Sequence, residues 1–198
     1  MGSLDDGERT EGGFDLNSIM HASEPFTTKE FFALDVDEKL KVELIGGALA
    51  VSPSSKPWHG DVTLELRDAL KTALGPRFRI YLDLDVRIDE ENVPRPDVFV
   101  VLSQPSKRDR VTEAADVLLA VEIMSPGSKV NDRRVKPSLY REAGIPSWRI
   151  ERSGESLVLI EMPVCGPEET HVGQVTLEVA HVDVPIDLDE IAHYAFGE

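Results

Sequence analysis

The sequence predicts an α/β fold in which one sheet is covered by a small number of helices. Three patterns support this prediction. Apolar and polar residues alternate strictly over residues 78–89, which is the period of a strand with one wetter face. Residues 95–102 and 117–124 are almost continuously apolar, as expected of central strands. Apolar residues recur at helical spacing over residues 60–74, so helical and strand patterns follow one another along the chain.

The length of 198 residues is sufficient for one well-buried domain and too short for two full ones. Residues 1–24 are rich in Gly, Asp, Glu and Ser and show no sustained period, which predicts a disordered N-terminal segment. Residues 25–198 are therefore expected to form a single domain.

Charge and cysteine content restrict the classes of function. The 37 acidic side chains exceed the 21 basic ones and give a net charge of −16, the opposite of the basic surface of most nucleic-acid binders. The single cysteine, Cys165, excludes an internal disulfide framework and a cysteine-based zinc site. No apolar run approaches the roughly 18 residues of a membrane span, and no signal pattern opens the chain, so we expect a cytoplasmic protein without a membrane partner.

The first ordered elements carry recognisable local signals. Residues 27–30 read Thr-Thr-Lys-Glu, which fits a capping box at the start of a short helix. Gly46 and Gly47 separate two apolar runs within residues 42–51 and predict a β-hairpin, because Gly-Gly takes the positive φ angles of a two-residue turn. The helix over residues 60–74 ends at Gly75 and Pro76.

The second half of the chain predicts further strands around one helix. Residues 103–116 form a polar connection that can hold a short irregular helix. The segment 131–143 is predicted to be helical, with regular helix from near Lys136 because Pro137 is tolerated only in a first turn. The remaining predicted elements are a hairpin over residues 148–162, an alternating strand over 175–182 and a short helical tail over 185–191.

Each of the two apolar strands carries one carboxylate, Asp97 or Glu122. A buried unpaired charge costs on the order of several kcal/mol, so each needs a cation, a metal ion or a shifted pKa. Carboxylates at matching heights on neighbouring strands about 4.8 Å apart can share one ion, and all-oxygen ligation favours Mg²⁺ or Mn²⁺. Lys136 lies on the element that returns over the strand ends and can reach the same place, although a simple ion pair remains the alternative.

These residues resemble a known nuclease pattern. Pro96-Asp97, a later Glu on a central strand and a Lys are similar to the PD-(D/E)XK nuclease superfamily, except that Met124 stands where its Lys usually lies. Glu122-Ile-Met-Ser-Pro and Lys136-Pro-Ser-Leu-Tyr resemble the Uma-two family of restriction-endonuclease-like proteins, in which the Lys has moved to the following helix. The resemblance spans about residues 25–196. It implies a restriction-endonuclease-like mixed central sheet flanked by helices, with added β-hairpins.

The resemblance also implies roles for individual residues. Asp97 and Glu122 are implied metal ligands, joined by the backbone carbonyl of Ile123, with Glu43 as an accessory acid and Lys136 as the base. Three further residues are candidates for the surroundings of the site: Asp132, Tyr140 and His59. Of these, Tyr140 is expected to brace Lys136 from the next turn of the helix, and His59 is expected more often as a cap or surface residue.

The leading hypothesis is a Mg²⁺- or Mn²⁺-dependent endonuclease that hydrolyses DNA phosphodiester bonds, with a homodimer implied by resemblance. The net charge is the main objection, which a small basic rim of Arg77, Arg79, Lys107, Arg108, Arg110, Arg133 and Arg134 can offset locally. The alternative is a non-catalytic or partner-activated module that keeps the fold for regulation or assembly. A hydrolase for small phosphate substrates ranks last, because no Gly-rich phosphate-binding loop is present.

Overall fold

The computed structural model describes residues 25–36, 40–52, 55–103, 111–124 and 131–197, without the side chains of Asn131 and Asp132. The N-terminal segment for which disorder is predicted, residues 1–24, lies outside these ranges. Three members of the predicted basic rim, Lys107, Arg108 and Arg110, also lie outside them.

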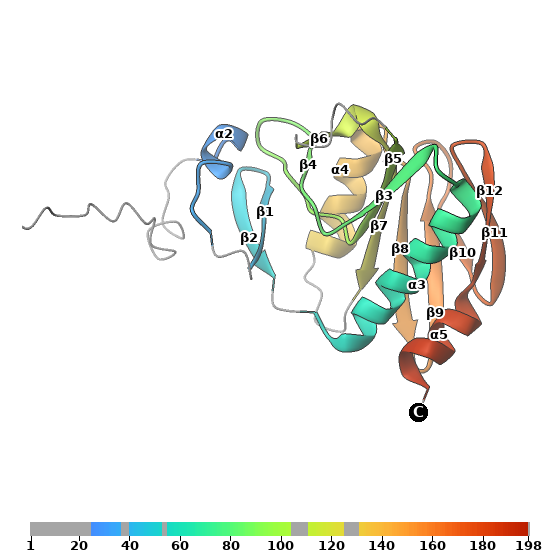
Figure 1. Ribbon diagram of the computed structural model, residues 1–198. Coiled ribbons are helices and arrows are strands. Elements are labelled where there is room, and N and C mark those ends of the chain that lie inside the picture. The colour runs from blue at the N-terminus through green and yellow to red at the C-terminus, as the bar shows by residue number, and fades with distance from the viewer. Residues whose placement is uncertain (1–24, 37–39, 53–54, 104–110, 125–130, 198) are drawn as a thin grey trace, which may run out of the picture.

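A six-stranded mixed sheet forms the centre of the molecule (Figure 1). In sheet order its strands are β10 (Glu169–His171), β9 (Ser156–Met162), β8 (Ser147–Ser153), β7 (Val117–Met124), β5 (Val98–Leu102) and β3 (Phe78–Leu82). The neighbours β7 and β8 run parallel, and the other described pairs of this sheet are antiparallel. The predicted α/β fold with a mixed central sheet is confirmed.

Helices cover both faces of this sheet (Figure 1). Helices α3 (Pro57–Leu74) and α5 (Leu188–Phe196) pack on one face together with the hairpin of β11 (Gln174–Val179) and β12 (Val182–Asp187). Helix α4 (Lys136–Glu142) packs on the other face. There Tyr140 of the helix and Ile145 just after it form a second core cluster with residues of the sheet that include Phe99 and Ala120.

The alternation of side chains along β5 decides which face receives the site. Val98 and Val100 belong to the core on the α3 face, whereas Phe99 and Val101 belong to the core on the α4 face. Successive side chains of a strand point to opposite faces, so Asp97, two residues before Phe99, belongs to the α4 face. On β7 the same rule places Glu122 with Ala120 on the α4 face.

The chain enters α4 through a short π-helical turn, Asn131–Val135, and regular helix begins at Lys136. The predicted start near Lys136 is therefore confirmed, with Pro137 in the first turn where its missing N–H costs little. The predicted irregular helix in the polar connection corresponds to the 3₁₀ turn Ala114–Asp116.

A separate N-terminal layer consists of α2 (Thr28–Phe31) and the hairpin of β1 (Lys41–Ile45) and β2 (Ala48–Ser52). The predicted capping box is present, because the Thr27 side chain accepts from Glu30 N and Thr27 N donates to the Glu30 carboxylate. Gly46 and Gly47 have φ angles of 58° and 71°, as the predicted hairpin turn requires. This layer has a small core of its own: Phe31, Val42, Leu44 and Val93.

Residues 78–89 were predicted to form one strand, but the structure divides them into two. The segment breaks at Asp83, which adopts a positive φ of 51°, and strand β3 ends at Leu82. The following strand, β4 (Val86–Arg87), leaves the central sheet and pairs in parallel with β6 (Thr112–Glu113). Alternation persists across the break, so the sequence pattern alone did not reveal it.

The C-terminal prediction is also corrected. The segment 175–182 turns at Ala180 and His181, which have φ angles of 50° and 65°, and residues 182–187 return as β12. Helix α5 starts only at Leu188, capped by Asp187, whose carboxylate accepts from the backbone N–H groups of the first turn. Neither turn residue is a glycine or asparagine, so the usual hairpin signal is missing. Among the described helices none is both long enough and apolar enough to cross a bilayer.

Candidate metal centre

The two strand carboxylates face one another at the end of the β5–β7 pair. Val98 pairs with Val121 in an antiparallel register, and extending that register by one residue sets Asp97 opposite Glu122. Residues directly opposite on antiparallel strands have Cβ atoms about 5 Å apart and share a face. Both side chains are buried, with 7% and 5% of their residue surface exposed. The predicted meeting of these carboxylates is thus supported by register and burial together.

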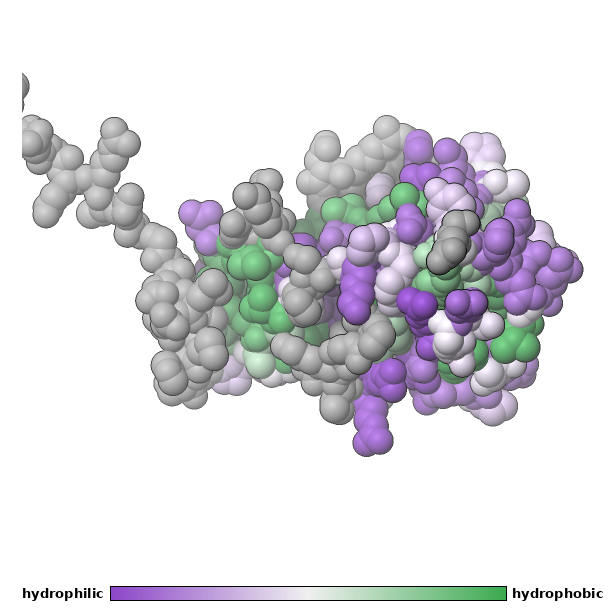
Figure 2. Space-filling model, turned by 90° about the horizontal axis from the view of Figure 1, so that it is seen from below, coloured by the Kyte–Doolittle hydropathy of each residue, from purple (hydrophilic) through white to green (hydrophobic). Residues whose placement is uncertain are grey.

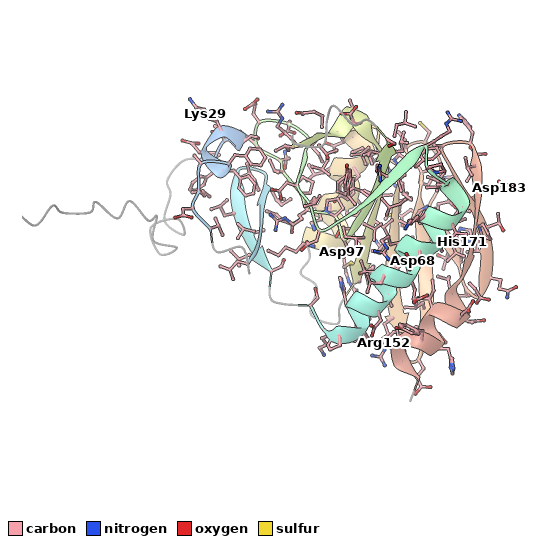
Figure 3. All side chains as sticks on the ribbon, viewed as in Figure 1. Lys29, Asp68, Asp97, Arg152, His171 and Asp183 are labelled. Carbon is pink, nitrogen blue, oxygen red and sulfur yellow. The ribbon has the colours of Figure 1, made fainter. Side chains whose placement is uncertain are left out.

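Asp97 is held by groups from three different elements. Its Oδ2 accepts a 2.8 Å hydrogen bond from the backbone N–H of Ile123 on β7 and lies 3.2 Å from Nε2 of His59, in the first turn of α3. Its Oδ1 accepts a 2.7 Å hydrogen bond from Nζ of Lys41, the first residue of β1. Asp97 therefore joins the N-terminal hairpin to the central sheet (Figure 3).

Glu122 is bound by two residues of helix α4. The hydroxyl of Tyr140 donates a 2.7 Å hydrogen bond to Oε1, and Nζ of Lys136 lies 3.3 Å from Oε2. Lys136 and Tyr140 are four residues apart and so lie one above the other on the same helix face. Tyr140 thus supports Glu122 directly, not Lys136 as expected from the helix spacing.

Glu43 completes the cluster from the β1 strand. Its Oε1 lies 2.7 Å from Nζ of Lys136 and also accepts a 2.7 Å hydrogen bond from the backbone N–H of Arg95. Glu43 and Lys136 are both almost wholly buried, with 1% and 2% of their surface exposed. The lysine predicted to reach the two strand carboxylates therefore lies between Glu43 and Glu122.

The pKa values of Asp97 and Glu122 are shifted in opposite directions. Burial alone raises the pKa of Asp97, but the hydrogen bond with His59 and the charge of Lys41 outweigh it and hold the pKa well below its usual range. Burial raises the pKa of Glu122 to about 7, with the negative charge of Asp97 adding to the rise and Lys136 opposing it. Burial and the adjacent Glu122 carboxylate also raise the pKa of Tyr140, so its hydroxyl stays a proton donor.

The donor set fits a hard divalent cation. Three buried carboxylates, from Glu43, Asp97 and Glu122, are accompanied by two ammonium groups, so the carboxylates are in excess. Burial is the main cause of the raised pKa of Glu122, and the negative charges of Asp97 and Glu43 add to it. Carboxylate and backbone oxygens are the ligands that Mg²⁺ and Mn²⁺ prefer, and no described cysteine or histidine pair competes for a softer metal here.

Three further candidate site residues, His59, Ile123 and Asp132, remain to be placed in the structure. His59 is 9% exposed and contacts Asp97, so the expected surface or cap role is wrong: in the first turn of α3 its side chain points into the site. The N–H of Ile123 donates to Asp97. The N–H and C=O groups of one strand residue point to the same side of the strand, so the Ile123 carbonyl also faces the side on which Asp97 lies. The side chain of Asp132 lies outside the described part of the chain.

Sequence reasoning missed Lys41. Lys41 directly precedes the predicted strand, which was expected to begin at Val42, and the structure extends that strand to Lys41. Lys41 and Glu43 are two residues apart and so project from one face. What the sequence could not supply is the partner, since Asp97 lies 56 residues further along the chain.

A second group of potential ligands lies elsewhere on the sheet. Glu161, Glu169 and His171 offer ligand atoms within 4.8 Å of one another on the edge strand β10 and its neighbour β9. Figure 3 shows His171 well away from Asp97, and His171 Nε2 lies within hydrogen-bond distance, 3.1 Å, of a Glu161 oxygen. The group is separate from the cluster around Asp97.

Comparisons with known proteins agree with this fold. The family model Uma2, described as "Putative restriction endonuclease", matches residues 28–182, well over half of the chain. The crystal structure of "a putative nuclease belonging to DUF820" from Anabaena variabilis ATCC 29413 is similar, with a TM-score of 0.69 and 17% sequence identity over 87% of this chain and 100% of that one. A search of curated proteins found no match.

Proposed function

The chain belongs to the Uma2, or Uma-two, family of restriction-endonuclease-like proteins, and on that premise we propose that it is a metal-dependent endonuclease that hydrolyses phosphodiester bonds in DNA. The observation that carries the proposal is the convergence of Asp97, Glu122 and Lys136. Buried ionisable groups cluster at functional sites, and this cluster draws them from the residue that precedes β5, from β7 and from α4.

In this proposal Asp97, Glu122 and the Ile123 carbonyl hold one Mg²⁺ or Mn²⁺ ion. When bound, the ion lowers the pKa of a coordinated water and offsets negative charge on the scissile phosphate. Tyr140 fixes one Glu122 oxygen through its 2.7 Å hydrogen bond, and the Ile123 N–H fixes Asp97 Oδ2. Both carboxylates are thereby oriented before any ligand arrives, which reduces the cost of binding.

Lys136 is proposed to act through its positive charge, on the attacking water or on the phosphate. Its ammonium lies between Glu43 and Glu122, where it can orient the attacking water or stabilise the negative charge that develops on the phosphate oxygens. Glu43 acts as a positioning residue, because its Oε1 is itself held by the Arg95 N–H and lies 2.7 Å from Nζ. Cutting both strands would use two such sites, so a homodimer is part of the proposal.

The test is DNA cleavage by the purified protein. We expect supercoiled plasmid to be nicked or linearised with Mg²⁺ or Mn²⁺ and to stay intact with EDTA. Asp97→Asn and Glu122→Gln proteins should lose at least about a hundredfold in rate, because each removes a charged ligand. The exposed Glu155→Gln on the β8–β9 turn is the matched control and should cut like the wild type.

Equal cleavage by the Asp97→Asn and wild-type proteins contradicts the proposed site. The second candidate function is a non-catalytic module with the nuclease fold. The observation favouring that candidate is that Asp97 and Glu122 already have internal cation partners in Lys41 and Lys136. Absence of cleavage together with absence of Mn²⁺ binding by calorimetry decides for the non-catalytic module.

A further inference from the structure

Lys41 contacts the proposed metal ligand Asp97, yet the nuclease pattern assigns it no role. Its Nζ lies 2.7 Å from Asp97 Oδ1 and 3.3 Å from Asp83 Oδ1, so one ammonium bridges a buried carboxylate and an exposed one. The side chain of Lys41 is 20% exposed, whereas that of Lys136 is only 2% exposed. Lys41 is thus the cation at the rim of the cluster and Lys136 the cation at its centre.

The two oxygens of Asp97 are not equally available to an ion. Oδ2 is held by the Ile123 N–H, which belongs to the central strand β7 and cannot move without disturbing the sheet. Oδ1 accepts from Lys41, a side chain with a flexible stem. A divalent cation that binds Asp97 therefore meets the Lys41 ammonium at Oδ1, and two positive charges about 4 Å apart repel each other strongly in a buried site.

Asp83 offers Lys41 a second partner on the outside. Its side chain is 58% exposed, and its backbone N–H lies 3.3 Å from the carbonyl oxygen of Asp97, which ties the two residues together. The positive φ of Asp83 ends strand β3 and turns the chain at this point, next to the cluster. A small movement of the Lys41 ammonium toward Asp83 would release Oδ1 while keeping one ion pair.

We propose that Lys41 is an internal counter-ion that holds Asp97 in the metal-free protein, competes with the divalent cation for Oδ1, and is transferred to Asp83 when the cation binds. This inference rests on the proposed function, because it concerns the same ion. If Lys41 competes in this way, the protein binds the divalent cation more weakly than the same carboxylates would without Lys41.

Calorimetric titration with Mn²⁺ tests the competition. The Lys41→Met protein, which keeps the aliphatic stem and loses the charge, should bind Mn²⁺ at least about tenfold more tightly than the wild type, because a nearby positive charge is removed. The Lys71→Met protein, altered at an exposed lysine on α3, is the matched control and should bind like the wild type. Unchanged or weaker binding by Lys41→Met overturns the proposal.

Asp83→Asn tests the transfer at an exposed position where folding is little affected. It should weaken Mn²⁺ binding several-fold in the wild-type background and much less in the Lys41→Met background, because only a released ammonium needs Asp83. An equal loss in both backgrounds overturns the transfer step. If neither the wild type nor Lys41→Met binds Mn²⁺, the nuclease proposal fails too; if both bind it equally and the wild type cuts DNA, only the role of Lys41 fails.

Discussion

At the scale of single residues, Asp97 and Glu122 have opposite electrostatic surroundings although they face each other. Asp97 is stabilised as an anion by Lys41, His59 and a backbone N–H. Glu122 has Tyr140 and Lys136, but it also faces the negative charges of Asp97 and Glu43, and burial raises its pKa to about 7. A divalent cation beside Glu122 would therefore lower its raised pKa.

The raised pKa of Glu122 predicts how stability depends on pH without metal. A carboxyl whose folded pKa lies above its unfolded value stabilises the fold below about pH 4.5, and that contribution is lost as pH rises through about 7. In EDTA, the unfolding free energy in urea should decline from pH 5 to pH 8, with at most about 3 kcal/mol from this group.

The Glu122→Gln protein should lack most of this decline, whereas Glu155→Gln should keep it. The same pH slope in wild type and Glu122→Gln would show that Glu122 is ionised throughout the range. Urea denaturation at four pH values, followed by Trp fluorescence, is sufficient for the comparison.

At the scale of elements, the β1–β2 hairpin is not part of the central sheet but delivers two site residues to it. Lys41 and Glu43 project from one face of β1 and contact Asp97 and Lys136, respectively. An isolated two-stranded hairpin is marginal in water, and this one is supported by α2 and by the bridge from Leu44 to Val93. The order of the site therefore depends on how firmly the hairpin turn is packed.

The two turn glycines provide a matched pair for testing this dependence. Gly46→Ala and Gly47→Ala both place a side chain at positive φ, at a cost of about 1 kcal/mol. Only at Gly47 would the new Cβ also overlap Pro25, since nothing lies within 4 Å of a Cβ at Gly46.

We therefore expect Gly47→Ala to lower the thermal unfolding midpoint clearly more than Gly46→Ala, because only Gly47→Ala also disturbs the packing of the hairpin turn on Pro25. Circular dichroism melting measures the difference. Equal destabilisation by both substitutions would mean that the contact with Pro25 does not support the hairpin.

At the scale of the whole molecule, the surface is at odds with a DNA substrate. The net charge is −16. On the face shown in Figure 2, hydrophilic residues predominate over the part that holds the central sheet, and hydrophobic residues gather toward the end that holds α2 and the hairpin. DNA binding with this charge has to rely on a few local cations. Arg133 and Arg134 are exposed on the turn that leads into Lys136, which makes them the best placed of the described basic residues.

We predict that Arg133→Ala/Arg134→Ala weakens DNA binding and lowers the slope of log affinity against log salt by about 1 to 2, because up to two phosphate contacts are lost. Fluorescence anisotropy in EDTA over a series of KCl concentrations measures both quantities. The control pair Arg67→Ala/Lys71→Ala on α3 should leave them unchanged. A double variant with wild-type slope would place the DNA elsewhere on the molecule.

Much of this protein follows from local sequence signals. The capping box at Thr27, the Gly-Gly turn, the helix start at Lys136 and the strands around Asp97 and Glu122 each depend on neighbouring residues or a short period. Each of these features depends only on residues close together in the chain, so the sequence alone predicts them. Because side chains alternate along a strand, the two carboxylates could also be expected to meet.

The tertiary structure alone decided which groups surround those carboxylates. Lys41 and His59 reach Asp97 across 56 and 38 residues of chain, and Tyr140 binds Glu122 in preference to its helical neighbour Lys136. The break at Asp83 and the turn at Ala180 and His181 likewise have no local signature. Such contacts depend on how distant elements pack, and the periodicity of one element carries no information about the side chains of another.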